Sequence, residues 1–574
     1  MCSEPDTYWG NFLIMRIVLF TALIMLFNGL FAYLTNLPED VGLDVPDGKL
    51  NSLSYAPFRE GQSPLTEEFS TPEQIDEDLQ LLAGKTHAIR TYASALGLKV
   101  IPELARKHGL KMIQGAWIGY VDKDIPKELD ELVYAANTYP DVVKRVIVGN
   151  EVLLRGERTP EELVKYIREV KKRVKQPVSY ADVWSMYMKY PDLIKEVDFI
   201  TIHILPYWED EPIPVEKAPA HIERIYKQVR EEAERISPGK PILIGESGWP
   251  SEGRQRGWAV PTVANEAAFI RGLLKVAADN HFDVNIVEAF NQSWKSELEG
   301  VVGANWGLFS VDRKEVFPLT GKVYENAKWF SQFLIASFIM VLVVCCHTKK
   351  LQNLPSLKIA TFLIFVQVLC ALLVFQADKT WYTSYDNWQR IKAVLIVLLN
   401  IAVAGFVIHR ASNLLTDAET KKTVITALDA LYLIVIALSL YKTYLLAVDG
   451  RYISFPFELA VVPITGLLGL FCMRCLVDRV ALSNLDFNRL IGRYPANNQR
   501  NRHIGWLLLF YAACLAVGET KAFMLGRDFI LAYPDVVERL GWATTFALTN
   551  CQMLGWLACL VILASSLLVN AKQG

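Results

Sequence analysis

The sequence predicts an α/β fold, a (β/α)8 TIM barrel followed by an all-α multi-span transmembrane domain. Charged residues concentrate between Pro38 and Lys328, whereas both flanks contain apolar runs long enough to cross a bilayer. Within the charged region, short β-rich runs alternate with amphipathic helical stretches, which is typical of βα units. The chain of 574 residues is also longer than one ordinary soluble domain. We therefore expect an N-terminal tail and transmembrane anchor (residues 1–36), a linker (37–49), a barrel (50–322) and a seven-span domain (323–574).

The first apolar run, Ile17–Leu34, follows Arg16 and is long enough for one crossing. A cleavable signal peptide is the alternative interpretation. No cleavage site of the small-residue type follows the run before Pro38, so we interpret it as an uncleaved anchor.

Seven further apolar runs follow Lys328, separated by charged or turn-rich connections. They are Trp329–Cys346, Ile359–Ala377, Ala393–Ile408, Val424–Val448, Leu459–Leu476, Ile504–Leu525 and Trp542–Val569. Lysine and arginine are more frequent in alternate loops, at Lys349, Lys350, Lys358, Arg410, Lys421, Lys422, Arg474, Arg479, Arg489, Arg493, Arg500 and Arg502. Because positively charged loops remain in the cytoplasm, we expect both termini inside and the middle domain on the non-cytoplasmic side of the cell (inner) membrane. The lipid bilayer is therefore one expected partner.

Eight β-rich runs predict the strands of the barrel. They are Leu53–Phe58, Ala88–Tyr92, Lys111–Trp117, Arg145–Asn150, Pro177–Ala181, Phe199–Leu205, Pro241–Gly245 and Asn285–Phe290. Between them, Thr71-Pro72 and Thr159-Pro160 each place a capping hydroxyl before a proline, followed by acids, which indicates helix starts. A doubly wound open sheet is the alternative, but no Gly-rich phosphate loop follows the first strand.

Charge and cysteine content narrow the class of protein further. The 61 acidic and 59 basic side chains leave a formal net charge of −2, which argues against a nucleic-acid-binding protein because such proteins concentrate positive charge on one face. All nine cysteines lie outside the middle region, so that region contains no disulfide. Cys472 and Cys475 have a metal-like spacing but no accompanying pair, and we interpret them as ordinary helix residues. We expect no metal and no cofactor.

Two glutamates stand at the ends of predicted strands. Barrels of this type carry their chemistry at the C-terminal ends of strands, and Glu151 and Glu246 directly follow the fourth and seventh runs. Glutamate is depleted in strands and seldom fully buried, so both positions are unusual. Glycoside hydrolysis requires two carboxylates, one to protonate the departing oxygen and one to meet the cationic sugar. We interpret the pair as catalytic; the alternative is two solvated loop acids.

Four short motifs make this interpretation specific. They are IVGNEVL at Ile147–Leu153, IGESGWPS at Ile244–Ser251, SYAPF at Ser54–Phe58 and NWGLF at Asn305–Phe309. Together they resemble the signatures of glycoside hydrolase family 17, whose members are retaining β-1,3-glucan-active enzymes on a (β/α)8 barrel. The resemblance covers roughly Leu50 to Lys322.

The resemblance implies roles for individual residues. Glu151 would be the general acid/base and Glu246 the nucleophile, whose negative charge is expected to raise the pKa of Glu151. Asn150 would bond the 2-hydroxyl of the sugar, and Lys295 matches a lysine found near the catalytic acid. The residues expected to line the cleft are Tyr55, His203, Tyr207, Trp249 and Trp294. Gln292 departs from the pattern, because the family has an acidic residue there, and this puts the charge network beside Glu151 in doubt.

The sequence therefore predicts a retaining glycoside hydrolase that cleaves β-1,3-glucan in the manner of an endo-β-1,3-glucanase, by double displacement with two glutamates. One alternative is a β-glucan transglycosylase that remodels or branches the cell's own periplasmic or cell-surface glucan. A third, from a different class, is a non-catalytic sugar-binding membrane partner for glucan export, which would work with a separate glucan synthase. The expected ligand in each case is a β-glucan polysaccharide or oligosaccharide.

Overall fold

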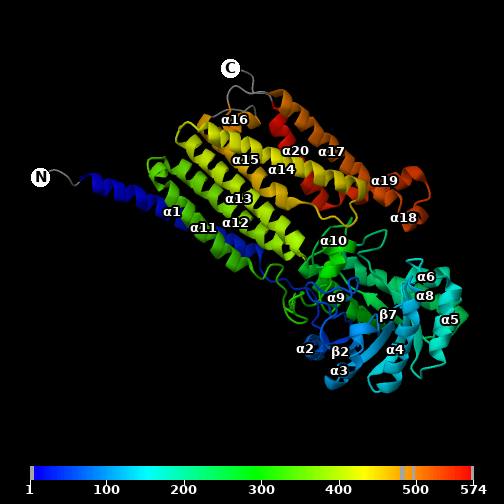
Figure 1. Ribbon diagram of the computed structural model, residues 1–574. Coiled ribbons are helices and arrows are strands. Elements are labelled where there is room, and N and C mark those ends of the chain that lie inside the picture. The colour runs from blue at the N-terminus through cyan, green and yellow to red at the C-terminus, as the bar shows by residue number, and fades with distance from the viewer. Residues whose placement is uncertain (1–4, 479–484, 494–497, 570–574) are drawn as a thin grey trace. The chain divides into compact units, whose positions relative to one another are not determined.

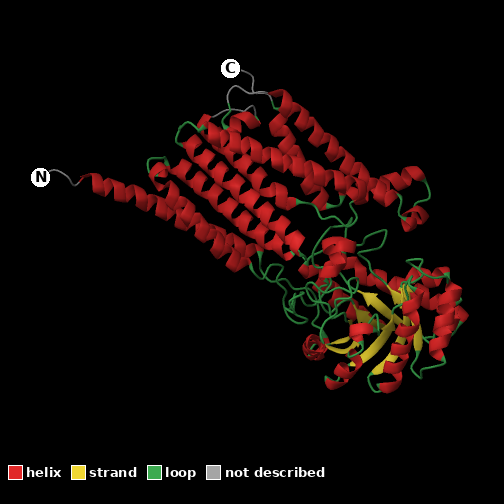
Figure 2. Ribbon diagram, in the orientation of Figure 1, coloured by secondary structure: helices red, strands yellow, loops and turns green. Residues whose placement is uncertain are grey.

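A computed structural model describes residues 5–478, 485–493 and 498–569 of the chain. Cys2 and Arg479, which entered the sequence interpretation, lie outside the described residues. The chain divides into two compact units: Pro38–Glu325, and Met1–Leu37 together with Asn326–Gly574. All named strands belong to the first unit, and the second is built of helices (Figures 1 and 2).

Eight parallel strands close into a barrel in chain order, which confirms the predicted fold class. They are β1 (Leu50–Ser54), β2 (Thr86–Arg90), β3 (Lys111–Ala116), β4 (Val143–Asn150), β5 (Val178–Val183), β6 (Ile200–His203), β7 (Ile242–Ser247) and β8 (Asp283–Ile286). Each overlaps one predicted run. The ring closes through the pairing of Leu53 with Ile286. This closure places the C-terminal ends of all eight strands around one mouth.

Five strands end earlier than predicted, and β1 and β8 do so by the largest margin. The runs Leu53–Phe58 and Asn285–Phe290 extend past the observed ends of β1 and β8, at Ser54 and Ile286. After β8 the chain leaves the regular ladder, because the Glu288 amide bonds to the carbonyl of Trp306 instead. The residues after each strand therefore belong to the loops at the mouth.

Helices surround the barrel. They are α2 (Pro72–Ala83), α3 (Ile101–Lys107), α4 (Ile125–Thr138), α5 (Pro160–Lys171), α6 (Trp184–Lys189), α7 (Leu193–Glu196), α8 (Ala218–Ile236), α9 (Val263–Asn280) and α10 (Ser296–Ala304), with short 3-10 turns η1 to η5. The predicted helix starts are confirmed: Thr71 and Thr159 each form a reciprocal capping box with the residue three positions on. The apolar faces of these helices pack against the strands in one continuous core.

The inside of the barrel contains polar side chains. The Ser52 hydroxyl donates to Asn285 Oδ1 at 2.6 Å, and Asn285 Nδ2 donates to the Gly245 carbonyl at 2.9 Å. Ser179 and Thr201 share a hydrogen bond of 2.8 Å. These buried groups hydrogen-bond to one another, so paired polar side chains extend through the interior of the barrel towards its mouth.

The incoming and outgoing segments of the barrel unit are paired. Glu39 and Val323 form an antiparallel bridge, with N–O distances of 2.7 and 3.0 Å. The Val45 amide donates to the Leu319 carbonyl at 3.1 Å. The chain therefore enters and leaves this unit at one place.

In the second unit, the described residues include eight helices that are long and apolar enough to cross a membrane, by length and composition. They are α1 (Pro5–Thr35), α11 (Trp329–Leu351), α12 (Ser356–Tyr382), α13 (Asn387–Leu415), α14 (Lys422–Asp449), α15 (Phe457–Asp478), α17 (Asn498–Met524) and α20 (Cys551–Leu568). Shorter helices are α16 (Phe487–Ile491), α18 (Arg527–Ala532) and α19 (Val536–Leu548). The last predicted run, Trp542–Val569, is divided between α19 and α20, because Asn550 caps α20 by accepting from the Met553 amide at 3.0 Å.

Helix α1 packs into this bundle through polar contacts. Gln367 Nε2 on α12 donates to Asn28 Oδ1 at 2.8 Å, and Arg16 donates to the carbonyl of Leu354 at 2.6 Å. At the other end of α1, the rings of Tyr33 and Trp329 lie 6.0 Å apart. The last turn of α1 and the first turn of α11 are therefore neighbours.

Basic residues from separate predicted loops meet at one end of the bundle. Arg493 and Arg500 both pair with Asp429 of α14, at 3.0 and 2.6 Å. Arg410 of α13 donates to the carbonyl of Leu490 at 3.0 Å. These contacts stabilise the end of α16, whose last carbonyls accept hydrogen bonds from arginine side chains.

Candidate active site

Glu151 and Glu246 meet at the barrel mouth. Glu151 directly follows β4, and Glu246 is the last residue but one of β7. One carboxylate oxygen of each lies within 4.8 Å of the other and of a ring nitrogen of His203. Their side chains are 21% and 11% exposed, respectively. Both glutamates are thus mostly buried, close together and open to the mouth on one side.

The strand ends are distorted where these residues stand. The pairing of β4 with β5 shifts register between Ile147 and Asn150, and that of β7 with β8 shifts between Ile244 and Ser247. Glu151 itself adopts the left-handed conformation, with φ of 52°, which costs a non-glycine residue about 1–3 kcal/mol. Bulges of this kind redirect a side chain. The backbone thus turns Glu151 away from the regular strand pattern and towards the mouth.

Arg90, at the end of β2, binds Glu246 and Asn150 from across the barrel. Its Nη1 donates to Glu246 Oε1 at 3.0 Å and to the Gly245 carbonyl at 2.7 Å. Its Nη2 donates to Asn150 Oδ1 at 2.6 Å. Sequence reasoning missed this residue, although the signal was present: an arginine that ends an apolar strand is as unusual as a glutamate there. We call Glu151, Glu246, Arg90 and His203 the mouth cluster.

Asn150 is the last residue of β4, directly before Glu151, and is 8% exposed. Because its Oδ1 accepts from Arg90, the orientation of the amide is fixed. Its Nδ2 is the group that remains as a donor to a ligand.

The structure corrects the predicted position of His203. This residue was expected to line the cleft, but its side chain is 0% exposed. Its Nδ1 lies 2.9 Å from Glu151 Oε1, and its Nε2 lies 3.4 Å from Glu246 Oε1. His203 therefore contacts the glutamates and offers no surface to a sugar.

Three predicted cleft aromatics also lie in the core. Tyr55, Tyr207 and Trp249 are 1%, 0% and 0% exposed. Their polar atoms have partners inside the protein: Tyr207 donates to the Arg254 carbonyl at 2.5 Å, and Trp249 donates to the Val260 carbonyl at 3.0 Å. Such rings pack their apolar bodies beneath the loops, so the structure places them in the core and not along the surface of the cleft. Trp294 is only partly buried and remains a candidate.

Two exposed aromatics occupy the mouth instead. Trp117, directly after β3, is 42% exposed, and Tyr120 is 67% exposed. The Arg155 guanidinium stacks 4.7 Å from the Trp117 ring and lies 3.7 Å from Glu151 Oε2. The Tyr120 hydroxyl donates to the Arg155 carbonyl at 3.0 Å. The signal in the sequence was the position of Trp117 at the end of the third predicted strand.

Lys295 pairs with Glu288, which sequence reasoning did not single out. Lys295 Nζ lies 2.9 and 3.0 Å from the two oxygens of Glu288, which is 2% exposed. Burial raises the pKa of Glu288 in spite of the lysine. Gln292 is fully buried, and its Nε2 donates to the carbonyls of Ala56 and Phe290. A neutral amide suits that position, and the acidic partner of the lysine is Glu288.

The electrostatics of Glu151 differ from the expectation. Glu246 was expected to raise the pKa of Glu151, but the net shift is downward. Burial raises this pKa, yet the hydrogen bond and charge of His203, followed by the charges of Arg155 and Arg90, outweigh it. Nearby, burial raises the pKa of Asp182 to about 6.

The same atoms have the donor types of a metal site, since Glu151, His203 and Glu246 offer one ligand atom each. The Arg90 guanidinium, however, already stands 3.0 Å from Glu246 and 3.4 Å from His203 Nε2. The positive charge that these carboxylates face is therefore supplied by the protein.

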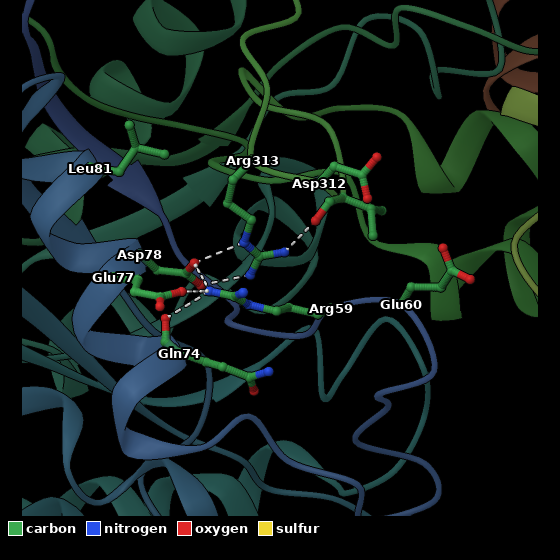
Figure 3. A pocket seen from close by; sticks show the side chains of 9 residues that line it. Arg59, Glu60, Gln74, Glu77, Asp78, Leu81, Asp312 and Arg313 are labelled. Carbon is green, nitrogen blue, oxygen red and sulfur yellow. Dashed lines mark hydrogen bonds and ion pairs between the residues drawn. The ribbon is translucent and has the colours of Figure 1, made fainter.

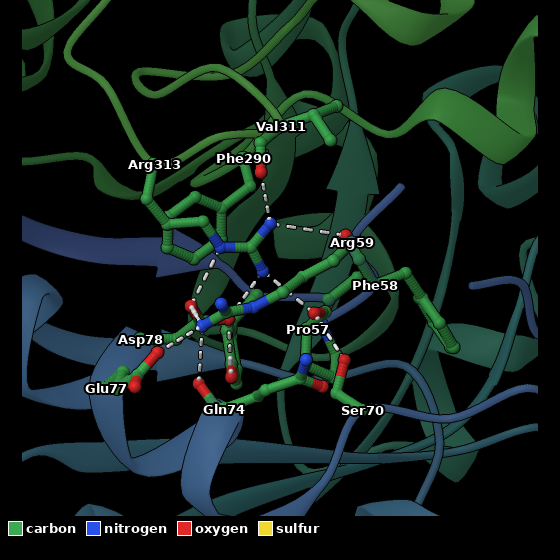
Figure 4. A network of polar contacts seen from close by, with 12 residues as sticks. Pro57, Phe58, Arg59, Ser70, Gln74, Glu77, Asp78, Phe290, Val311 and Arg313 are labelled. Atoms are coloured by element: carbon green, nitrogen blue, oxygen red, sulfur yellow. Dashed lines mark hydrogen bonds and ion pairs between the residues drawn. The ribbon is translucent and has the colours of Figure 1, made fainter. Parts of the chain in front are cut away.

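A second buried charge network lies beside the loops after β1 and β8. Arg313 binds both oxygens of Asp78, at 2.8 and 2.6 Å, and Arg59 lies 3.2 Å from Asp78 Oδ1 (Figure 3). Arg313 also donates to the Pro57 carbonyl at 2.8 Å and stacks on Phe290 (Figure 4). The Tyr55 hydroxyl donates to Asp78 Oδ2 at 3.3 Å. We call Asp78, Arg313, Arg59 and Tyr55 the Asp78 cluster; it fastens the two loops to α2.

The barrel unit is similar to known proteins. The family model for the BtgE/BtgC glycoside hydrolase domain matches residues 52–307. A glucan 1,3-beta-glucosidase of Arthroderma benhamiae is 29% identical over 270 residues, which cover 44% of this chain and 86% of that protein. A probable family 17 glucosidase of Saccharomyces cerevisiae is 26% identical over 270 residues, which cover 45% of this chain and 64% of that protein. The crystal structure of a glycoside hydrolase family 17 beta-1,3-glucanosyltransferase from Rhizomucor miehei is 27% identical, covers 46% of this chain and 95% of that chain, and has a TM-score of 0.39.

The matched region includes both glutamates, Arg90 and the strands that carry them. It excludes every helix of the second unit, so the family assignment concerns the barrel. Residues 52–307 of this chain are therefore a glycoside hydrolase family 17 domain of the BtgE/BtgC type.

Proposed function

We propose that the barrel is a retaining enzyme acting on β-1,3-glucan, with Glu246 as nucleophile and Glu151 as general acid/base. The observation that carries this proposal is the approach of their carboxylate oxygens to within 4.8 Å. Retaining glycosidases hold the two carboxyl groups about 5–5.5 Å apart, whereas inverting enzymes need about 6.5–9.5 Å to admit a water molecule. The short spacing supports covalent catalysis.

In the first step, Glu151 donates its proton to the glycosidic oxygen while Glu246 bonds to the anomeric carbon and the leaving sugar departs. The Arg90 contact, at 3.0 Å, orients the Glu246 carboxyl group. The lowered pKa of Glu151 means that its protonated form, which this step needs, is populated at acidic pH. We therefore expect activity to decline as the pH rises above that pKa.

In the second step, ionised Glu151 takes a proton from an incoming hydroxyl, whose oxygen bonds to the anomeric carbon and releases Glu246. The Asn150 amide, oriented by Arg90, is placed to bond the 2-hydroxyl of the sugar. Trp294, partly buried at the mouth, supplies an aromatic surface for a neighbouring sugar ring.

The incoming hydroxyl decides between hydrolysis and transfer. Water is present at about 55 M, so an acceptor at about 1 mM must be favoured by roughly 6 kcal/mol to compete. The exposed face of Trp117, beside Arg155 and Glu151, supports an acceptor site on the acid/base side. The glucanosyltransferase activity named for the Rhizomucor miehei enzyme also favours transfer as the second candidate function.

The helical unit bears on where this activity takes place. Its eight long apolar helices support the proposal of a membrane-tethered enzyme that remodels the cell's own glucan on the non-cytoplasmic side. A purely sugar-binding role is less well supported, because binding alone requires neither the close carboxylates nor the arginine that holds one of them.

The test uses the purified full-length protein with reduced β-1,3-oligosaccharides. Shorter products alone indicate hydrolysis, and products longer than the substrate indicate transfer. The anomer released first should be β, as retention requires. Release of the α anomer, or no turnover in the presence of bound oligosaccharide, would contradict the proposal.

A further inference from the structure

We propose that His203 is a positioning residue that holds Glu151 directly and Glu246 through Arg90, and that it thereby assigns the oxygen with which each glutamate reacts. This inference rests on the proposed function and extends it to a residue that makes no contact with substrate.

The first observation is the geometry of the imidazole. Its Nδ1 lies 2.9 Å from Glu151 Oε1, and its Nε2 lies 3.4 Å from Glu246 Oε1. Nε2 also lies 3.4 Å from Arg90 Nη2. One ring thus spans the space between the two carboxylates, and its side chain is 0% exposed.

The second observation is the way the fold places this ring. His203 and Glu246 are register partners in the pairing of β6 with β7, so adjacent strands hold them side by side. Gly245, the residue before Glu246, lies close to β6, because a Cβ there would stand 2.4 Å from Thr201 Cγ2. The charged groups that face His203 are Arg90 from β2, Glu151 after β4, Asp182 from β5 and Glu246 from β7.

The hydrogen-bond chemistry follows from these contacts. With the proton on Nδ1, the ring donates to Glu151 Oε1 and its Nε2 accepts from Arg90, so both ring nitrogens are paired. Glu246 Oε1 is held in turn by Arg90 at 3.0 Å. Each glutamate therefore has its Oε1 fixed by the inner network.

The second oxygen of each glutamate then carries the chemistry. Oε2 of Glu151 gives its proton to the glycosidic oxygen as the bond from that oxygen to the anomeric carbon breaks. Oε2 of Glu246 forms the new bond to that carbon. In the second step Oε2 of Glu151 takes the proton of the incoming hydroxyl, and the Glu246 ester is released as carboxylate, so protons and charge balance.

Substitutions at His203 can test which ring nitrogen positions the glutamates, because amide side chains of different length replace one nitrogen or the other. An asparagine amide mimics Nδ1, which faces Glu151, and a glutamine amide mimics Nε2, which faces Glu246 and Arg90; leucine removes both. The measurement is kcat/KM against pH on a laminari-oligosaccharide, because its alkaline limb reports the acid form of Glu151 in the free enzyme.

His203→Leu should lower kcat/KM on the oligosaccharide by about 100-fold and move the alkaline limb upward by about one pH unit, since Glu151 loses a donor that favours its charged form. His203→Asn should recover more activity than His203→Gln and keep the limb closer to that of the wild type. The equivalent dinitrophenyl glycoside needs no proton on departure, so its kcat/KM should fall less in His203→Leu than that of the oligosaccharide.

Three results would overturn the proposal: an unshifted alkaline limb in His203→Leu, equal losses on both substrates, or better recovery by glutamine than by asparagine. His108→Leu serves as the control, because His108 pairs with Asp76 at the end of α3 and should leave the limb unchanged. If the limb shifts equally in the control, it does not report Glu151 and the inference fails. A wild-type protein without turnover would instead contradict the proposed function itself.

Discussion

The mouth cluster and the Asp78 cluster both bury carboxylates against arginine in the same barrel, yet they differ in one respect. In the Asp78 cluster both oxygens are occupied: Oδ1 by Arg313 and Arg59, and Oδ2 by Arg313 and Tyr55. Asp78 is 0% exposed. In the mouth cluster Oε1 of each glutamate is held, Oε2 of Glu151 has only the longer contact of 3.7 Å with Arg155, and both side chains stay partly open. Burial and ion pairing alone therefore do not mark an active site; an inner network that leaves one oxygen facing the mouth does.

The strongest test of this difference is Glu246→Gln. The amide keeps a partner for Arg90 but cannot form the sugar ester, so kcat on a β-1,3-oligosaccharide should fall by on the order of 10⁴-fold or more. The apparent Tm of the full-length protein in detergent should change little. Glu77→Gln is the control, because Glu77 pairs with Arg59 through an exposed side chain and should leave kcat unchanged. Activity within 100-fold of the wild type would exclude Glu246 as the nucleophile.

Asp78→Asn should have the opposite profile. Removing one member of a buried ion pair leaves charge without compensation, and the loss should be about 3–5 kcal/mol in the free energy of unfolding. The kcat of the folded enzyme should remain close to that of the wild type. Thermal unfolding together with active-site titration measures both quantities. A fall in kcat without loss of stability would mean that the Asp78 cluster takes part in catalysis.

Asp182, beside the mouth cluster, should give a pH-dependent effect on stability. Its pKa is about 6 in the folded protein against 3.8 for the free side chain, so the folded state binds the proton more tightly. That stabilisation is complete below pH of about 4 and is lost as the pH rises through about 6; two units correspond to about 3 kcal/mol at most. Asp182→Asn should therefore flatten the fall in Tm between these values. Parallel pH profiles for the two proteins would show that Asp182 titrates normally.

Trp117→Ala should have the smallest effect and concern specificity. Loss of the exposed ring removes a stacking surface beside the acid/base, so the ratio of transfer to hydrolysis should fall about tenfold, equivalent to about 1.4 kcal/mol. Product lengths measured over a range of acceptor concentrations give this ratio. Tyr134→Ala, an exposed aromatic on α4, is the matched control. If hydrolysis falls and the ratio stays constant, Trp117 serves the donor side.

Features set by local sequence were predictable. The eight strands, the capping boxes and the two glutamates each depend on residues close together in the chain, so periodicity and position were sufficient to find them. The end of β8 was not, because the Glu288 amide bonds to Trp306 rather than to a strand. Likewise Asn550 divides the last apolar run. Its role as the N-cap of α20 depends on where that helix begins, which the apolar pattern alone does not show.

Contacts across the barrel were beyond the reach of sequence alone. Arg90 meets Glu246 and Asn150 from a strand on the far side of the ring, and no spacing rule connects these three positions. The exposure of side chains could not be predicted either. Trp249 and Trp117 both follow apolar strands, but Trp249 is buried and Trp117 is exposed. Loops that are distant in sequence decide which ring they cover.

The paired junctions of the two units have an evolutionary consequence. Glu39 and Val323 hold the two ends of the barrel unit together, and Tyr33 and Trp329 bring the matching helix ends within reach of each other. A catalytic module with adjacent termini can be placed in a helix–helix turn without disturbing the rest. The helical half therefore retains the geometry of an ordinary αα-hairpin at α1 and α11, and a short turn in place of residues 38–325 should let it fold on its own.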